Sequence, residues 1–113
     1  MRLTFLGTGT SGGIPMINCN CSVCRSDNPK NKRLRCSIMI EVKGLHILVD
    51  TAPDLRQQFL RQPFPKIDAV LFTHSHADHI FGLDDLRRFN YIQQAPIPVY
   101  GNPETIQRLQ TIF

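Results

Sequence analysis

The chain has 113 residues, of which 42% are hydrophobic, and a formal net charge of +4 from 13 basic and 9 acidic residues. This length and composition suit one small domain with a buried core, and so modest a charge does not by itself indicate nucleic-acid binding. No apolar run approaches the length of a membrane span, and glycines interrupt the N-terminal segment too soon for a signal peptide, so we expect a cytoplasmic protein without membrane contact.

Residues 2–7 alternate in polarity and predict a first strand. The segment 7–12 then matches the glycine pattern G-x-G-x-x-G of dinucleotide-binding loops, which requires a helix to begin at the third glycine. Gly13, Ile14 and Pro15 follow instead and are typical of a loop. We therefore interpret the glycines as allowing the backbone to pass close to a metal site or a substrate.

Three cysteines, Cys19, Cys21 and Cys24, fall within six residues. Without a signal sequence the cysteines are expected to stay reduced, so disulfides are not expected. Three thiolates this close together can bind one zinc ion tetrahedrally, with a fourth ligand from elsewhere. Thiols without metal and a nucleophilic cysteine remain alternatives. Cys36 stands apart in a strand-like run and is interpreted as a small buried hydrophobe.

The segment 25–35 is basic, because it carries five cations against the single carboxylate of Asp27. The cations are Arg25, Lys30, Lys32, Arg33 and Arg35. A solvated loop and a rim that attracts phosphate are both compatible with this pattern. Residues 36–42 and 45–50 then predict a hairpin that turns at Lys43-Gly44.

Asp50 ends the second strand of this hairpin. A carboxylate at a strand end can hydrogen-bond to metal-bound histidines and fix the tautomer of their rings. A cap for the next helix, predicted at residues 54–62 and ended by Pro63, is the alternative. His46 is in phase with Asp50, but a histidine in that position is more often on the surface, so we do not name it as a ligand.

The segment 74–79, His-Ser-His-Ala-Asp-His, contains three of the four histidines and a carboxylate. Imidazole and carboxylate are the usual ligands of zinc, manganese and iron. An apolar strand is predicted at 67–72. If the chain stays extended beyond it, His74 and His76 share one face with Cα atoms about 6.6 Å apart, which suits binding of one ion.

Asp78 and His79 are adjacent and, at the start of a helix, would hold a second ion. Two ions at a short separation form a clamp for the hydrolysis of esters and phosphodiesters. A polar turn whose histidines only cap a strand and a helix is the alternative.

A helix at 79–89, a strand at 97–101 and a last helix at 103–112 complete an α/β order of elements, as in one αβ half of an αββα sandwich.

The 74–79 motif, the loop at 8–15 and the three clustered cysteines together resemble the metallo-β-lactamase superfamily of hydrolases. Within it, the chain is most similar to the branch that contains the phosphodiesterase of phosphonate breakdown, and more distantly to ribonuclease Z. The resemblance implies these ligands: His74 and His76 for a first metal, Asp78 and His79 for a second, and Cys19, Cys21 and Cys24 for a structural zinc.

The resemblance implies a phosphodiesterase that uses a hydroxide held by two divalent ions, zinc or manganese. Asp78 would also act catalytically by orienting the nucleophile, and Asp50 would hold the histidines. We expect a small phosphate ester as substrate. RNA cleavage is less favoured, because the chain has no long basic arm and no aromatic stacking platform. Hydrolysis of a thioester or lactam is a further alternative, and a homodimer is left open.

A complete site of this kind also uses a later histidine on the first metal, a bridging aspartate and another histidine on the second. No histidine follows His79, and no aspartate follows Asp85. We therefore expect residues 1–113 to be the N-terminal half of a single metallo-β-lactamase-like domain, inactive alone and with one sheet face exposed. A metal-binding module without catalysis is the alternative of another class.

Overall fold

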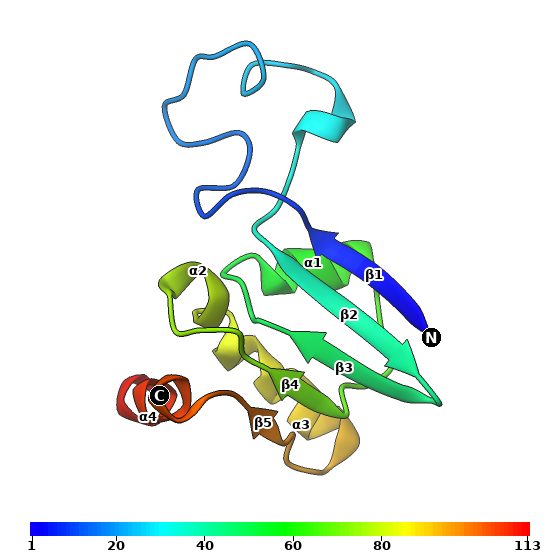
Figure 1. Cartoon of the computed structure of the whole chain (residues 1–113). Coiled ribbons are helices and arrows are strands. Elements are labelled where there is room, and N and C mark those ends of the chain that lie inside the picture. Colours follow the sequence, from blue (N-terminus) through cyan, green and yellow to red (C-terminus); the bar gives the residue numbers. More distant parts are fainter.

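A five-stranded sheet in the order β1-β2-β3-β4-β5 forms the centre of the computed structural model, which describes residues 1–113 (Figure 1). The strands are β1 (Arg2–Gly7), β2 (Ser37–Val42), β3 (Leu45–Val49), β4 (Ala69–Leu71) and β5 (Val99–Tyr100). β1, β2 and β3 pair antiparallel, whereas β4 and β5 join in parallel. The sheet therefore has the predicted mixture of a hairpin at the start and αβ alternation afterwards.

Short helices lie between the strands, and one more follows β5. They are η1 (Pro29–Asn31), α1 (Leu55–Arg61), α2 (Ala77–Ile80), η2 (Leu83–Leu86), α3 (Arg87–Gln93) and α4 (Pro103–Ile112). The helices predicted at 54–62 and 103–112 are confirmed, and Asn102 caps α4 by accepting a hydrogen bond from the N–H of Thr105 at 2.8 Å. No helix in the structure has the length and apolarity needed to cross a membrane.

The single helix predicted at 79–89 is wrong. The chain forms α2, turns at Phe81 and Gly82, and then continues as η2 and α3. The N–H of Gly82 donates to the carbonyl of Thr51 at 2.9 Å, which ties this turn to the segment after β3. The break follows from this long-range contact, because the apolar periodicity alone runs through it.

Gly82 also packs against backbone, since a Cβ at this position would lie 2.1 Å from the carbonyl oxygen of Ala52 and 2.9 Å from Cβ of Leu55. We expect Gly82→Ala to lower the free energy of unfolding by about 1–3 kcal/mol, because the turn must move outward. Urea denaturation measures the change. The control is Gly101→Ala, whose Cβ would come no closer than 3.4 Å to any atom. Equal costs for the two variants would contradict this packing.

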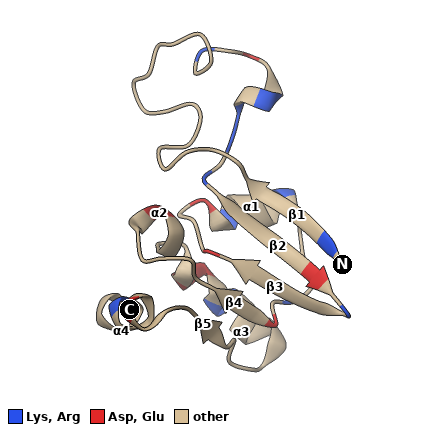
Figure 2. Ribbon diagram, viewed as in Figure 1, with Lys and Arg blue, Asp and Glu red and all other residues tan.

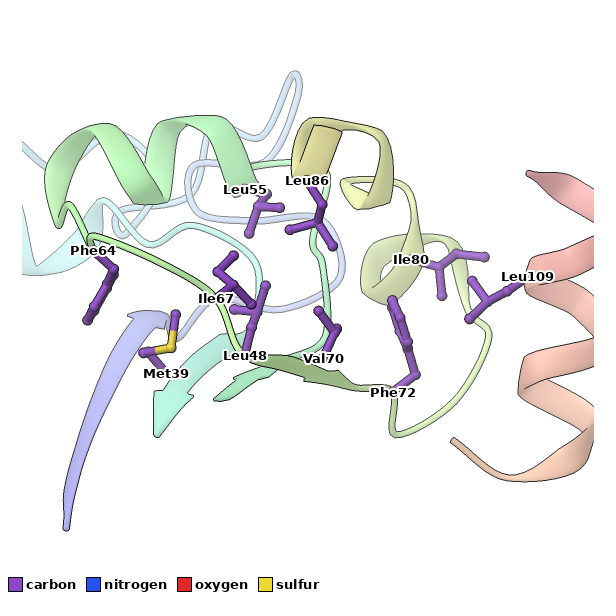
Figure 3. Packing of buried hydrophobic residues seen from close by; sticks show 10 residues of the cluster. All are labelled: Met39, Leu48, Leu55, Phe64, Ile67, Val70, Phe72, Ile80, Leu86 and Leu109. Atoms are coloured by element: carbon purple, nitrogen blue, oxygen red, sulfur yellow. The ribbon is translucent and has the colours of Figure 1, made fainter. Parts of the chain in front are cut away.

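The core lies between one face of the sheet and the helices (Figure 3). Met39, Leu48 and Val70 stand opposite one another on neighbouring strands and are fully buried. Leucine and isoleucine side chains from the helices close over them, namely Leu55, Ile80, Leu86 and Leu109. Because Ile80 belongs to α2, this packing holds α2 against the end of β4.

The other face of the sheet is apolar as well. The side chains that alternate onto it are Leu3, Phe5, Ile38, Ile40, Ile47, Val49, Leu71 and Tyr100. Phe5 is 67% exposed and Tyr100 is 56% exposed, so no element of the chain covers them. A single αβ half of a layered sandwich is expected to expose such a face, because the other half would bury it.

Residues 8–36 form a long excursion between β1 and β2 that projects beyond the end of the sheet (Figure 1). This excursion carries the clustered cysteines and the basic segment 25–35. Cys36 at its end is exposed, so the prediction of a buried residue there is wrong. The reason is that β2 begins one residue later, at Ser37, and Cys36 still belongs to the bend before the strand.

Candidate metal centre

The segment 74–79 lies where the chain leaves β4 at its carboxyl end. His76 is still extended, with φ −67° and ψ 149°, and α2 begins at the next residue. Asp78 and His79 therefore occupy the first turn of a helix, as predicted. The strand itself ends at Leu71, earlier than predicted, so His74 and His76 stand on an extended connection between β4 and α2.

The three imidazoles of this segment converge. The ring centroid of His74 lies 4.5 Å from that of His76 and 4.0 Å from that of His79. The carboxylate of Asp78 is next to them, with Oδ2 3.3 Å from Nε2 of His79. The structure thus brings together all four residues that the sequence singled out as candidate ligands of the paired metals.

Asp50 lies beneath these rings and is 5% exposed. Its Oδ2 accepts a hydrogen bond from Nδ1 of His79 at 2.8 Å, while its Oδ1 accepts the N–H of Thr73 at 2.8 Å. An ionised carboxylate can only accept, so Nδ1 of His79 carries the proton and Nε2 presents its lone pair. Asp50 also has φ +59°, a conformation rare in non-glycine residues and frequent at functional sites.

Thr73 is a site residue that the sequence analysis did not identify. Its hydroxyl donates to Oδ2 of Asp50 at 2.7 Å and lies 2.9 Å from Nδ1 of His74. Because the hydroxyl proton is used on Asp50, the oxygen accepts from Nδ1–H of His74, which leaves Nε2 of His74 free. Its position directly before the first histidine was the only available signal.

Thr51, next to Asp50, fixes α2 and was also not identified from the sequence. Its N–H donates to the carbonyl of His79 at 2.7 Å, and its hydroxyl donates to that of Ile80 at 3.1 Å. Thr51 is fully buried. The segment after β3 therefore holds the backbone of His79 as well as its ring.

The donor set fits divalent ions. Two ligand atoms that each lie about 2.1 Å from one ion are separated by roughly 3.0–3.4 Å. The 3.3 Å between Asp78 Oδ2 and His79 Nε2 falls in this range. The clustered cysteines are the only side chains that bring three ligand atoms within 4.8 Å of one another, so the 74–79 cluster does not present so compact a set.

The three clustered cysteines form a second group, with Sγ atoms that all lie within 4.8 Å of one another. The N–H of Cys24 donates to Sγ of Cys21 at 3.4 Å. This hydrogen bond, with a further contribution from the thiol of Cys19, lowers the pKa of Cys21 to about 7. A thiol with that pKa is substantially ionised at neutral pH, and the thiolate is the form that binds zinc.

His46 lies outside both groups. Its ring stands between the carboxylates of Glu41 and Asp68, at 3.6 and 3.7 Å, and makes an edge contact with Phe64. It therefore belongs to a polar cluster near the other end of β3. Leaving it out of the candidate ligands agrees with its position.

Comparison with known proteins gives one matching family model, the beta-lactamase superfamily domain, over residues 46–113. A curated relative, the octanoyltransferase of Porphyromonas gingivalis, is 51% identical over 97% of this chain, but the match spans only 22% of that protein. The chain therefore accounts for about a fifth of that relative's length, and the match does not locate the activity named for it.

Solved structures extend the likeness. A new diphosphatase from the PhnP family has 47% identity and a TM-score of 0.93, over 98% of this chain and 45% of its own. Zn²⁺-bound PqqB from Methylobacterium extorquens has 30% identity and a TM-score of 0.82, over 98% of this chain and 40% of its own. Human tRNase Z, short form, shares the fold at 23% identity and a TM-score of 0.70. These likenesses agree with the predicted αβ half of an αββα sandwich.

Proposed function

The chain belongs to the β-lactamase superfamily, and on that premise we propose that it is the N-terminal half of a metal-dependent phosphodiesterase. One observation carries this proposal: three imidazoles and a carboxylate converge at the end of β4, above the buried Asp50. The 47% identity to a diphosphatase supports hydrolysis at phosphorus. Since the chain spans 45% of the matching diphosphatase structure and 40% of the matching PqqB structure, a longer chain would complete the site.

In this proposal His74 and His76 bind one divalent ion, and Asp78 and His79 bind the other. The ions, zinc or manganese, would supply Lewis-acid activation of water and stabilisation of the charge that develops on the phosphoryl group. A neighbour with zinc bound supports zinc as the first choice. Cys19, Cys21 and Cys24 would hold a separate structural zinc, because three adjacent thiols with one lowered pKa suit that metal.

The chain's own residues prepare the ligand atoms. Asp50 keeps a proton on Nδ1 of His79 and, through the hydroxyl of Thr73, on Nδ1 of His74. Both rings then present Nε2 to the site. Holding these tautomers in advance removes the cost of ordering the rings when a ligand binds. Asp78 adds an acceptor that can orient the O–H of an attacking water.

Phosphodiester hydrolysis is the preferred activity, and acyl-ester hydrolysis is the second candidate because a hydroxide held by divalent ions can also attack a carbonyl carbon. We test both with bis-p-nitrophenyl phosphate and p-nitrophenyl octanoate. The comparison uses residues 1–113 and a longer chain that begins with them. The metal content of both proteins is measured in parallel.

We expect the longer chain to hydrolyse the phosphodiester, to lose this activity with a chelator and to recover it with zinc or manganese. Residues 1–113 alone should show little or no turnover. Faster turnover of the octanoate would favour the acyl-ester alternative. A longer chain that contains no transition metal and still hydrolyses the diester would contradict the proposal. Bound metal without any turnover would instead favour a non-catalytic metal-binding module.

A further inference from the structure

The basic side chains of the protein are unevenly partnered. Some form ion pairs with carboxylates, namely Arg2, Arg35, Lys66, Arg87 and Arg108. Others have no carboxylate partner although they gather on one part of the molecule: Lys30, Lys32, Arg33 and Arg61. Figure 2 shows Lys and Arg along the segment between η1 and β2, which approaches the helix α1. The two segments are far apart in the sequence.

Two adjacent hollows lie at this meeting point. Their volumes are about 330 and 350 Å³, and both are lined by Lys32, Arg33, Leu34 and Arg61. Gly12, Gly13 and the ion pair of Arg35 with Asp54 also line the first hollow, and Gly7, Thr8 and Lys30 also line the second. These volumes are at the small end of the range for small-molecule sites. No residue of the 74–79 motif lines either hollow.

The backbone that carries Lys32 and Arg33 is held firmly on the glycine loop. Arg33 exchanges two backbone hydrogen bonds of 2.8 Å with Ile14, and the N–H of Gly9 donates to the carbonyl of Leu34 at 2.7 Å. A Cβ at Gly7 would lie 1.9 Å from the carbonyl oxygen of Arg35. The glycines therefore do allow a close backbone contact, as the sequence suggested. The contact is with the basic segment 25–35, and not with the metal site that the sequence analysis named.

Arg35 fastens the same segment to α1. Its guanidinium donates to Asp54 at 2.9 Å and to the carbonyl of Ser11 at 2.7 Å, and its own carbonyl accepts from Gln58 at 2.8 Å. The charge of Arg35 is thus used within the protein, and so is that of Asp54. Lys32, Arg33 and Arg61 therefore have no carboxylate partner, although the backbone around them is held in place by hydrogen bonds.

Arg33 is oriented further by its own side chain. Its Nε donates to the carbonyl of Lys30 at 2.9 Å, which fixes the guanidinium plane and leaves both terminal nitrogens available. A fixed fork of donors suits the bidentate recognition of phosphate, and a phosphate carries enough charge and acceptors to contact several cations at once. A single carboxylate would leave part of this set unused.

We propose that Lys32, Arg33 and Arg61 form a phosphate-binding site separate from the candidate metal centre. Its ligand is a phosphate group, carried either by a small phosphorylated molecule or by a nucleic-acid strand. The site requires no metal, so it does not depend on the function proposed above. An experiment can therefore contradict the phosphate-binding site without contradicting the proposed function, and the reverse also holds.

The test compares Arg33→Gln/Arg61→Gln with Lys43→Gln in a longer chain that contains these residues. Lys43 is an exposed cation without a carboxylate partner, in the turn between β2 and β3, and lines neither hollow. The probes are inorganic pyrophosphate and a single-stranded oligothymidylate, titrated by calorimetry. Both are titrated into protein that also carries His76→Ala, which weakens competition from the candidate metal centre.

We expect Arg33→Gln/Arg61→Gln to bind the preferred probe at least tenfold more weakly than Lys43→Gln does. Tighter binding of pyrophosphate would identify a small phosphorylated ligand, and tighter binding of the oligonucleotide would identify a nucleic-acid strand. Equal binding by the two variants, or no binding of either probe, would overturn the proposal. Circular dichroism checks that both variants are folded.

Discussion

Alanine in place of His76 is expected to lower the hydrolysis of bis-p-nitrophenyl phosphate by at least about a hundredfold in a longer chain that begins with residues 1–113. Mutating a residue that only orients a metal ligand lowers metal affinity or activity by about 10–100-fold. Mutating a residue that itself contacts the ion should lower activity further. Removing the ring also leaves His74 without the neighbour 4.5 Å away that would share its ion. The measurements are kcat/KM and the number of ions bound per chain.

Ser75→Ala is the matched control, because it changes the neighbouring side chain within the same connection and removes no candidate ligand. It should retain activity within about a few-fold. Asp78→Ala should resemble His76→Ala in activity while removing the other ion of the pair. If both variants keep the wild-type rate, the cluster does not perform the chemistry and the proposed function is wrong.

The strands could be predicted from the sequence because the patterns that indicate them are local. Alternation in residues 2–7 and the Lys43-Gly44 turn depend only on neighbouring residues, and both match β1 and the β2–β3 hairpin. The break at Gly82 was not accessible in this way. It depends on the hydrogen bond from Gly82 to the carbonyl of Thr51, about thirty residues earlier in the chain, and the apolar period of residues 79–89 conceals it.

The candidate site likewise contains a part that could be predicted from neighbouring residues and a part that depends on distant contacts. His74, His76, Asp78 and His79 are close in sequence, so their proximity in space could be predicted from strand and helix geometry. The bridging contacts of Thr73 could not, because they join the ends of β3 and β4 across the parallel pair. A role for Asp50 was expected from the family resemblance, but its link to His74 through a threonine hydroxyl required the structure.

The glycine loop gives a third example. Its pattern suggested close approach of the backbone, and Gly7 and Gly9 do permit such an approach. The partner, however, is the basic segment at Leu34 and Arg35, whose position depends on pairing between parts of one long excursion. A local pattern can therefore show that a glycine is needed without showing which segment it accommodates.

Asparagine in place of Asp50 is expected to weaken zinc binding at the candidate metal centre by about 10–100-fold. It should also lower the free energy of unfolding by about 1–3 kcal/mol. The carboxylate accepts from three donors: Nδ1 of His79, the hydroxyl of Thr73 and the N–H of Thr73. An asparagine has one oxygen and one NH₂ group, so either orientation sets the NH₂ group against at least one of these donors.

The reason for so large an effect is that one side chain fixes both rings. Without the charge of Asp50, the tautomer of His79 is no longer fixed directly, and that of His74 is no longer fixed through Thr73. The binding of both proposed ions is therefore weakened together. Asp84→Asn is the control, because it makes the same chemical change at a carboxylate that is 63% exposed and paired with Arg87. Competition with a chromophoric chelator measures zinc affinity, and urea denaturation measures stability. If Asp50→Asn binds zinc as tightly as Asp84→Asn, Asp50 does not orient metal ligands, and its burial has only a structural role.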